Sequence, residues 1–190
     1  MTRSVAALLL VLSLSLTSRP VLGAATLTID ASHTAVIFSW HHRGYSHPLA
    51  RLEQVQGTVH LDTADLSKSS VSVVLPLEGL RTGDAALDRR LRGAEFFEAS
   101  RFTEITFTST AVKRAGPQRL QVTGDLRVHG MTQPAILDVR INRIDIGSDQ
   151  KLTAGFDADA KLRRSDFALG RYVPMVGDEL TVHITLEAVE

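Results

Sequence analysis

Apolar and polar residues alternate with a period of two along most of the chain after its first 25 residues. The alternation is cleanest from Leu120 to His129 and from Leu180 to Ala188, where every second residue is apolar apart from Gly124. Successive side chains of a strand point to opposite faces, so each segment predicts a strand with one dry face and one wet face.

Similar alternation elsewhere brings the expected total to about nine strands. The further predicted strands are Leu27–Asp30, Ala35–His41, Leu52–Asp62, Ser69–Leu77, Glu104–Lys113, Gln133–Ile144 and Lys151–Arg163. Glycine and proline predict turns at Arg114–Gln118 and at His129–Pro134.

One segment departs from this rhythm, between Asp84 and Gly93. Asp84 occupies an N-cap position, Leu87 and Leu91 are four residues apart, and Gly93 follows the last polar residue. This pattern predicts a short amphipathic helix, which we expect to lie across one end of the sheet.

Strands of about ten residues joined by short hairpins indicate an all-β fold. We expect an antiparallel barrel of about eight strands, because closing the sheet into a barrel removes exposed strand edges. A two-sheet sandwich is the alternative. An outer-membrane barrel would need aromatic girdles at both interfaces. The chain has one Trp, two Tyr and seven Phe, which do not bracket the strands. We therefore expect the apolar face to point inward and predict no stable membrane insertion.

The N-terminal segment resembles a cleaved secretory leader. An apolar run from Val5 to Leu16 follows Arg3, and the small residues Gly23, Ala24 and Ala25 come after it. An apolar run this short does not span a bilayer as a permanent helix. We predict a signal peptide over residues 1–24, a mature N-terminus between Ala24 and Thr26, and one exported domain over residues 25–190.

Composition excludes several function classes. The chain contains no cysteine, so it has neither disulfides nor a thiol nucleophile. It carries 21 basic and 21 acidic side chains without a clustered basic face, which argues against nucleic-acid binding. No Gly-x-Ser-x-Gly elbow, glycine-rich phosphate loop or His-Glu-x-x-His sequence occurs, so we expect neither an enzyme nor a bound cofactor.

Three histidines, His41, His42 and His47, gather where a strand ends and offer an alternative function as a metal site. Adjacent residues on a strand face opposite ways, which opposes a shared ion at His41 and His42. Carboxylates at strand ends, such as Asp30, Asp62 and Asp65, are explained by turn chemistry.

Aromatic residues form a second candidate set. Trp40 shares one strand face with Val36 and Phe38, which predicts a continuous apolar wall. The wider set has two interpretations, the lining of a pore for an apolar chain or ordinary core packing. Its members are Phe38, Trp40, Phe96, Phe97, Phe107, Phe156 and Phe167.

The order and spacing of many short motifs resemble those of the YceI-like family of exported bacterial lipocalin-like barrels. The motifs are Ile29-Asp-Ala-Ser-His-Thr34, Phe38-Ser-Trp-His-His-Arg-Gly44, Gly57-Thr-Val-His-Leu-Asp62, Lys68-Ser-Ser-Val-Ser-Val73, Thr82-Gly83, Leu91-Arg-Gly-Ala-Glu-Phe-Phe97, Ile105-Thr-Phe-Thr-Ser-Thr110, Val122-Thr-Gly-Asp-Leu126, His129-Gly130, Arg164-Ser-Asp-Phe167 and Val176-Gly-Asp-Glu-Leu180. The chain departs from the family pattern at Leu49-Ala-Arg-Leu52, where the family has Arg-Gly-Arg-Phe, and at Arg90, where it has His.

The resemblance implies a periplasmic binding or carrier protein whose barrel pore holds a polyisoprenoid lipid, an isoprenoid quinone or a fatty-acid derivative. The expected partner is thus an apolar long-chain small molecule, with pairing of two chains and a quinone-linked redox partner at the membrane left open. A hydrolase acting on lipid-like substrates is a further alternative. The expected ligand-binding residues are Val36, Phe38, Trp40, His42, Val73, Leu75, Asp84, Leu87, Arg90, Leu91, Phe96, Phe107 and Phe156.

Overall fold

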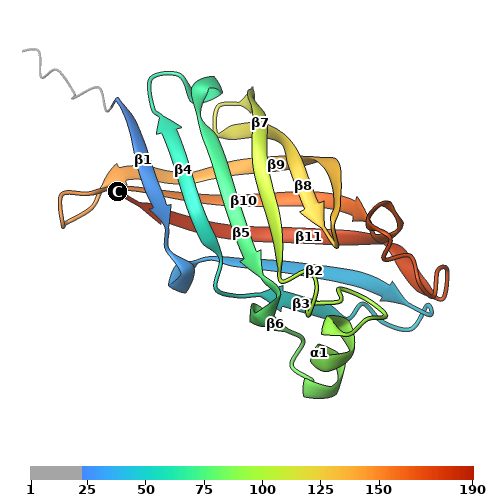
Figure 1. Cartoon of the computed structure of the whole chain (residues 1–190). Coiled ribbons are helices and arrows are strands. Elements are labelled where there is room, and N and C mark those ends of the chain that lie inside the picture. The colour runs from blue at the N-terminus through green and yellow to red at the C-terminus, as the bar shows by residue number, and fades with distance from the viewer. Residues whose placement is uncertain (1–22) are drawn as a thin grey trace, which may run out of the picture.

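Eight antiparallel strands close into a barrel in the computed structural model, which describes residues 23–190 (Figure 1). Pairing of Thr28 with Val189 and of Ile29 with Ala188 closes the ring. Around the ring the strands are β1 (Ala24–Ile29), β4 (Gln56–Asp62), β5 (Ser70–Pro76), β7 (Glu104–Gly116), β8 (Arg119–Val128), β9 (Met131–Ile146), β10 (Leu152–Arg163) and β11 (Val176–Val189).

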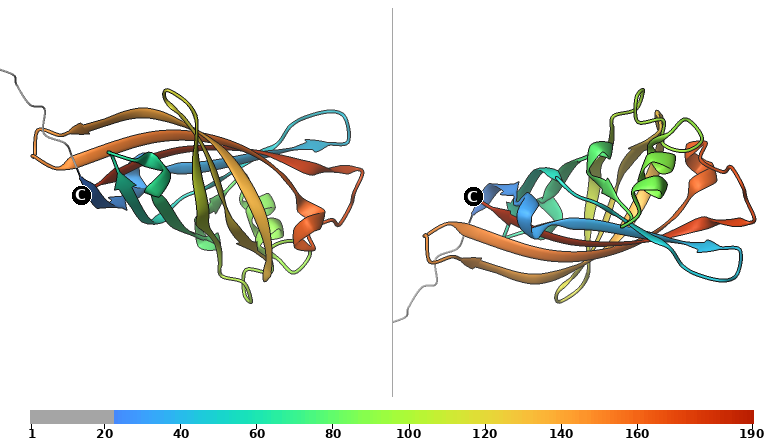
Figure 2. Two further views of the ribbon diagram at one scale, coloured as in Figure 1. Left: turned by 90° about the horizontal axis from the view of Figure 1, so that it is seen from above. Right: turned by 90° about the horizontal axis from the view of Figure 1, so that it is seen from below.

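Strand β11 has two neighbours on the same side. Its C-terminal end pairs with β1, and most of its remaining length pairs with β2 (Ala35–His42). Strands β3 (Leu49–Leu52) and β6 (Leu80–Arg81) continue the sheet from β2. The short 3-10 helix η1 (Ala31–His33) separates β1 from β2. The hairpin β2–β3 and the segment before β11 project together at one end of the molecule (Figure 2).

The predicted antiparallel barrel and its dry interior are confirmed. Along β8 the alternate residues Leu120, Val122, Leu126 and Val128 are buried. On β11, Val182 is buried between the exposed Thr181 and His183. The alternation therefore identifies the face that builds the core.

Two local predictions are wrong. The predicted strand Leu52–Asp62 is two strands, because Gln54 has a positive φ of 60° and the chain turns between β3 and β4. The predicted turn His129–Pro134 is only two residues long, since His129 and Gly130 both have positive φ angles, 51° and 76°, and β9 begins at Met131. Such a turn matches the twist of the flanking strands.

The predicted helix is confirmed as α1 (Ala85–Arg92), with Gly93 as its C-cap. The Asp84 carboxylate accepts hydrogen bonds from the backbone N–H groups of Ala86 and Leu87. The Asp88 carboxylate is buried and accepts from the backbone N–H and the hydroxyl of Thr82, at 2.7 and 2.6 Å. Hydrogen bonding by Thr82 lowers the pKa of Asp88. These bonds hold α1 against the end of the barrel (Figure 1).

The predicted leader, residues 1–24, lies almost wholly outside the described residues. Within residues 23–190 there is no helix with the length and apolar character needed to cross a membrane.

Candidate functional site

The barrel encloses a cavity of about 680 Å³, in the range typical of small-molecule sites. Inward side chains of β2 and of the ring strands other than β1 line it, together with side chains of α1 and of the loop before β11. Most of the lining is aliphatic or aromatic. Such a cavity suits a molecule that is apolar along most of its length.

The wall predicted on β2 is present. Val36, Phe38 and Trp40 are buried and line the cavity. Their partners across the ladder on β11, which are Ile184, Val182 and Leu180, line it too. The ring centroids of Phe38 and Trp40 are 6.0 Å apart, and Phe97 meets Phe38 edge to face at 6.3 Å. The result is a continuous wall with an aromatic stretch at its centre.

Helix α1 closes part of one end of the cavity. Leu87, Arg90 and Leu91 lie at positions i, i+3 and i+4, which share one helix face, and all three line the cavity. The helix therefore presents two leucines and one arginine to the interior.

A buried arginine builds the loop that completes this end. Arg164, in η4 (Arg164–Phe167), donates hydrogen bonds to the carbonyl oxygens of Gly177, Leu169, Arg171 and Val176, at 2.6 to 3.2 Å. Burial lowers the pKa of the guanidinium. The anchored loop contributes Leu169, Tyr172 and Met175 to the lining.

Asp178 lies beside this anchor. Its carboxylate accepts hydrogen bonds from the Ser165 backbone N–H at 2.9 Å and the Ser165 hydroxyl at 2.7 Å. Burial alone would raise the pKa of Asp178, but the bonds from Ser165 and the charge of Arg164 outweigh it and lower the pKa. The hydrogen bonds between Asp178 and Ser165 thus fix the two ends of the loop to each other.

The lining residues His42, Arg43, Arg90 and Met175 are exposed, so we call this end of the cavity its mouth. Arg90 lies there among aromatic rings. Its guanidinium is 5.9 Å from the ring centroid of Phe96 and 5.5 Å from that of Tyr172. Glu95 forms an ion pair of 3.0 Å with Arg171 and a longer one of 3.6 Å with Arg90. Both polar contacts of Arg90, with Glu95 and with the Tyr172 hydroxyl at 3.4 Å, involve Nη2, so Arg90 retains donors for a polar group of a ligand.

Some of the charged and imidazole side chains in the lining already have hydrogen-bond or ion-pair partners within the protein, and others do not. Asp157 forms a close ion pair with Arg140, which lowers the pKa of Asp157, and Arg164 is bonded to carbonyls. Arg43 and His42 have no side-chain hydrogen bond or ion pair within residues 23–190. With Arg90, they are the groups available to a ligand's polar end.

The structure brings together all but one of the expected ligand-binding residues. The expected residues that line the cavity are Val36, Phe38, Trp40, His42, Val73, Leu75, Leu87, Arg90, Leu91, Phe96, Phe107 and Phe156. Asp84 does not line it, because its carboxylate caps α1. Sequence reasoning missed Arg43, Arg164 and Tyr172. Arg43 and Arg164 lie inside motifs that resemble the family pattern, but nothing in the local sequence distinguishes them from surface arginines.

The three histidines do not all lie together. His41 and His47 lie in edge-to-face contact with ring centroids 4.9 Å apart, whereas His42 faces the cavity. This separation follows from strand geometry, as expected.

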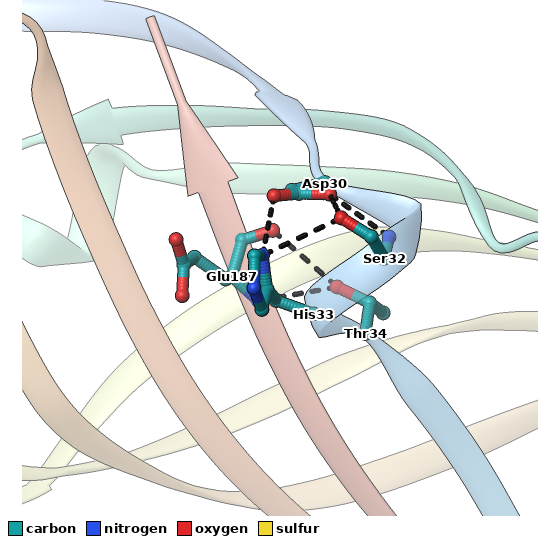
Figure 3. A network of polar contacts seen from close by, with 5 residues as sticks. All are labelled: Asp30, Ser32, His33, Thr34 and Glu187. Carbon is teal, nitrogen blue, oxygen red and sulfur yellow. Dashed lines mark hydrogen bonds and ion pairs between the residues drawn. The ribbon is translucent and has the colours of Figure 1, made fainter.

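Within residues 23–190, Asp30, His33 and Glu187 are the group whose ligand atoms come within 4.8 Å of one another (Figure 3). The Asp30 carboxylate accepts from the Ser32 backbone N–H and hydroxyl and lies 2.7 Å from His33 Nδ1. Hydrogen bonding to Asp30 raises the pKa of His33, and the bonds from Ser32 and His33 lower that of Asp30. These bonds cap η1, the turn chemistry expected for Asp30.

An eight-stranded barrel with an apolar interior cavity defines a lipocalin-like class of ligand-binding barrels. Within that class, the YceI-like domain model matches residues 27–188, and the chain belongs to this family. Over 163 residues it is 31% identical to Protein YceI of Salmonella arizonae, covering 85% of this chain and 84% of that protein.

Solved structures share the fold. The crystal structure of BcnA from Burkholderia cenocepacia matches with a TM-score of 0.76 and 21% identity, over 84% of this chain and 98% of that chain. A polyisoprenoid binding domain from Saccharophagus degradans matches with a TM-score of 0.66 and 15% identity, over 85% and 97%. At these identities the likeness extends to the fold alone.

Proposed function

We propose that this protein is a periplasmic carrier that holds one long-chain apolar molecule in its barrel cavity. The observation that carries the proposal is the continuous apolar lining, from the wall Val36, Phe38 and Trp40 to Leu87 and Leu91 of α1. The leader expected in residues 1–24 supports export.

The ligand classes that fit are polyisoprenoid lipids, isoprenoid quinones and fatty-acid derivatives. Burying apolar area is worth ~25 cal/mol per Å², so a chain that buries about 400 Å² would gain roughly 10 kcal/mol before the entropy costs of binding. The Saccharophagus degradans domain, which shares the fold, is described as polyisoprenoid binding, and this supports the first class. Such binding requires no catalytic step.

The polar end of the ligand would lie at the mouth. His42, Arg43 and Arg90 line the cavity at this end, beside apolar side chains such as Trp40 and Leu91. A molecule with a polar head and an apolar tail would therefore enter tail first, with its head between β2 and α1.

Native mass spectrometry of the purified protein, followed by organic extraction, tests the proposal. We expect an extractable long-chain molecule and a change in the fluorescence of Trp40, the single tryptophan, when it is removed. The same change should reverse when a polyprenol or an isoprenoid quinone is added to delipidated protein.

Variants of Phe38 test whether the ligand binds inside the cavity. Phe38→Ala should weaken binding by removing contact, and Phe38→Gln should weaken it further by admitting water. Phe102→Ala is the matched control, because Phe102 packs on His129 and is not part of the lining. A lipid-free extract together with unchanged Trp40 fluorescence on adding either lipid would refute the carrier function.

A further inference from the structure

The mouth of the cavity carries a cluster of exposed apolar side chains. Seven large hydrophobic residues are exposed within residues 23–190, and four of them lie on the two segments that flank the mouth. These four are Tyr45 (88% exposed), Leu49 (54%), Val173 (43%) and Met175 (55%). Single exposed apolar residues are ordinary on protein surfaces, whereas a cluster at one place marks an interaction site. We call these four residues the apolar rim.

The two segments of the apolar rim are joined by backbone contacts. The Arg43 N–H donates to the Met175 carbonyl at 2.8 Å, and His42 pairs with Val176. Met175 and Pro48 also line the cavity. Figure 2 shows the hairpin β2–β3 and the loop before β11 projecting together from the same end. The apolar rim is therefore continuous with the opening of an apolar cavity.

The charge around the apolar rim is positive. From His41 to Ala50 the chain contains Arg43, three histidines and no acidic residue, and from Ala168 to Val176 the charged residue is Arg171. Arg51, farther along β3, is paired with Glu53. The nearby carboxylate of Glu95 is already paired with Arg171 and Arg90. Cationic residues among exposed apolar and Tyr side chains are typical of surfaces that bind anionic membrane interfaces.

We propose that the apolar rim docks on the surface of an anionic lipid bilayer with the cavity mouth facing the membrane. Tyr45, Leu49, Val173 and Met175 enter the interface, while Arg43 and Arg171 lie at the level of the lipid head groups. In this orientation an apolar molecule passes between bilayer and cavity without crossing water. The docking is peripheral, and it depends on the rim rather than on the identity of the ligand.

Vesicle co-sedimentation tests the proposal. Wild-type protein should bind vesicles of phosphatidylcholine with 30% phosphatidylglycerol at least tenfold more tightly than pure phosphatidylcholine vesicles. The double variant Tyr45→Ser with Met175→Ser should lose at least tenfold in binding. The matched control Met131→Ser with Ile136→Ser, which removes two exposed apolar residues of β9, should stay within twofold of wild type.

A second pair of variants tests the charge. Arg43→Gln with Arg171→Gln should reduce binding to the anionic vesicles and its dependence on salt. Lys113→Gln with Arg114→Gln, which removes the same charge from the exposed end of β7, should leave both unchanged. Equal effects of the two pairs would overturn the orientation proposed.

The absence of cysteine from the chain allows a site-specific readout. An environment-sensitive fluorophore on Tyr45→Cys should shift to the blue when anionic vesicles are added, and the same fluorophore on Ile136→Cys should not. Equal responses at both positions, or no preference for anionic vesicles, would overturn the proposal. A dimer in sedimentation velocity that is lost in the rim variant, without vesicle binding, would assign the rim to a second copy of the chain instead.

Discussion

The ring of Phe107 on β7 lies against the backbone of Gly124 on β8. A Cβ atom at position 124 would be 2.5 Å from Phe107 Cζ and 2.5 Å from the carbonyl oxygen of Thr108. Gly124 occupies an inward position between Val122 and Leu126, so the missing side chain is the space that the ring fills. A side chain at position 124 would therefore collide with the Phe107 ring that lines the cavity.

Gly124→Ala should therefore destabilise the barrel by about 1–3 kcal/mol, because the backbone oxygen of Thr108 cannot yield as a flexible side chain would. It should also displace Phe107 and reduce ligand binding. Urea unfolding and ligand titration measure the two effects. Gly155→Ala is the control, since its Cβ would meet the Asn142 Cβ at an ordinary 3.8 Å and should change stability by less than ~0.5 kcal/mol.

Val182→Asp should cost at least ~2 kcal/mol in the free energy of unfolding, because it places an unpaired charge in the apolar lining. Thr181→Asp, one residue away on the exposed face, should cost less than ~0.5 kcal/mol, since Thr181 pairs across the ladder with Lys161. It is a cleaner control than His183→Asp, because His183 contacts Asp159 at 2.9 Å. Chemical denaturation that shows equal tolerance at 181 and 182 would mean that the faces are reversed.

Arg164→Met should destabilise the protein by about 3 kcal/mol or more, since it leaves several buried carbonyl oxygens without a donor. The loop before β11 should become more susceptible to proteolysis. Arg127→Met, at an exposed position of β8, serves as the comparison and should have little effect. Limited proteolysis with mass mapping reports the loop directly, and equal cleavage in both variants would refute the anchoring role.

Arg90→Gln should weaken binding of an acidic amphiphile, such as a fatty acid, by about tenfold, equivalent to ~1.4 kcal/mol, and leave a fatty alcohol of the same length unaffected. Arg89→Gln removes the same charge from an exposed helix position outside the cavity lining and should bind both ligands as wild type does. Isothermal titration with the two ligands distinguishes the variants. A parallel loss for acid and alcohol would place Arg90 in packing rather than head-group binding.

The contact between Asp30 and His33 predicts a pH dependence of stability. Because Asp30 raises the pKa of His33 in the folded state, protonation of His33 favours folding. This contribution is complete below the unfolded pKa of about 6.5 and is lost as pH rises through the higher folded value. The melting temperature of wild type should therefore fall relative to that of His33→Gln between pH 5.5 and pH 9. Parallel curves for the two proteins would show that the contact is not coupled to folding.

Local pattern in the sequence was sufficient for most elements. The N-cap at Asp84, the leucines at 87 and 91 and Gly93 predict α1 to the residue, because helix caps and the helical period depend on neighbours within one turn. The alternation along β8 and β11 predicts the dry face for the same reason. The expected lining residues Phe38, Trp40 and Phe107 follow from that face once a barrel is assumed.

The break at Gln54 and the tight turn at His129 and Gly130 could not be read in the same way. Both depend on positive φ angles, which Gln and His adopt only where the surrounding strands impose them. The sequence predicts Asp84 both as the helix N-cap and as a ligand-binding residue. Its hydrogen bonds with Ala86 and Leu87 confirm the cap, and its side chain is not part of the cavity lining.

The sequence by itself determined the period of each strand, the ends of α1 and the face that turns inward, because these features depend on residues close in the chain. Only the tertiary structure shows that β11 pairs with both β1 and β2, that Arg164 holds the loop before β11, and that this loop lies beside the hairpin β2–β3 at the cavity mouth. Those relations join residues far apart in sequence. They form only when the barrel closes, because closure buries backbone polar groups that then require hydrogen-bond partners.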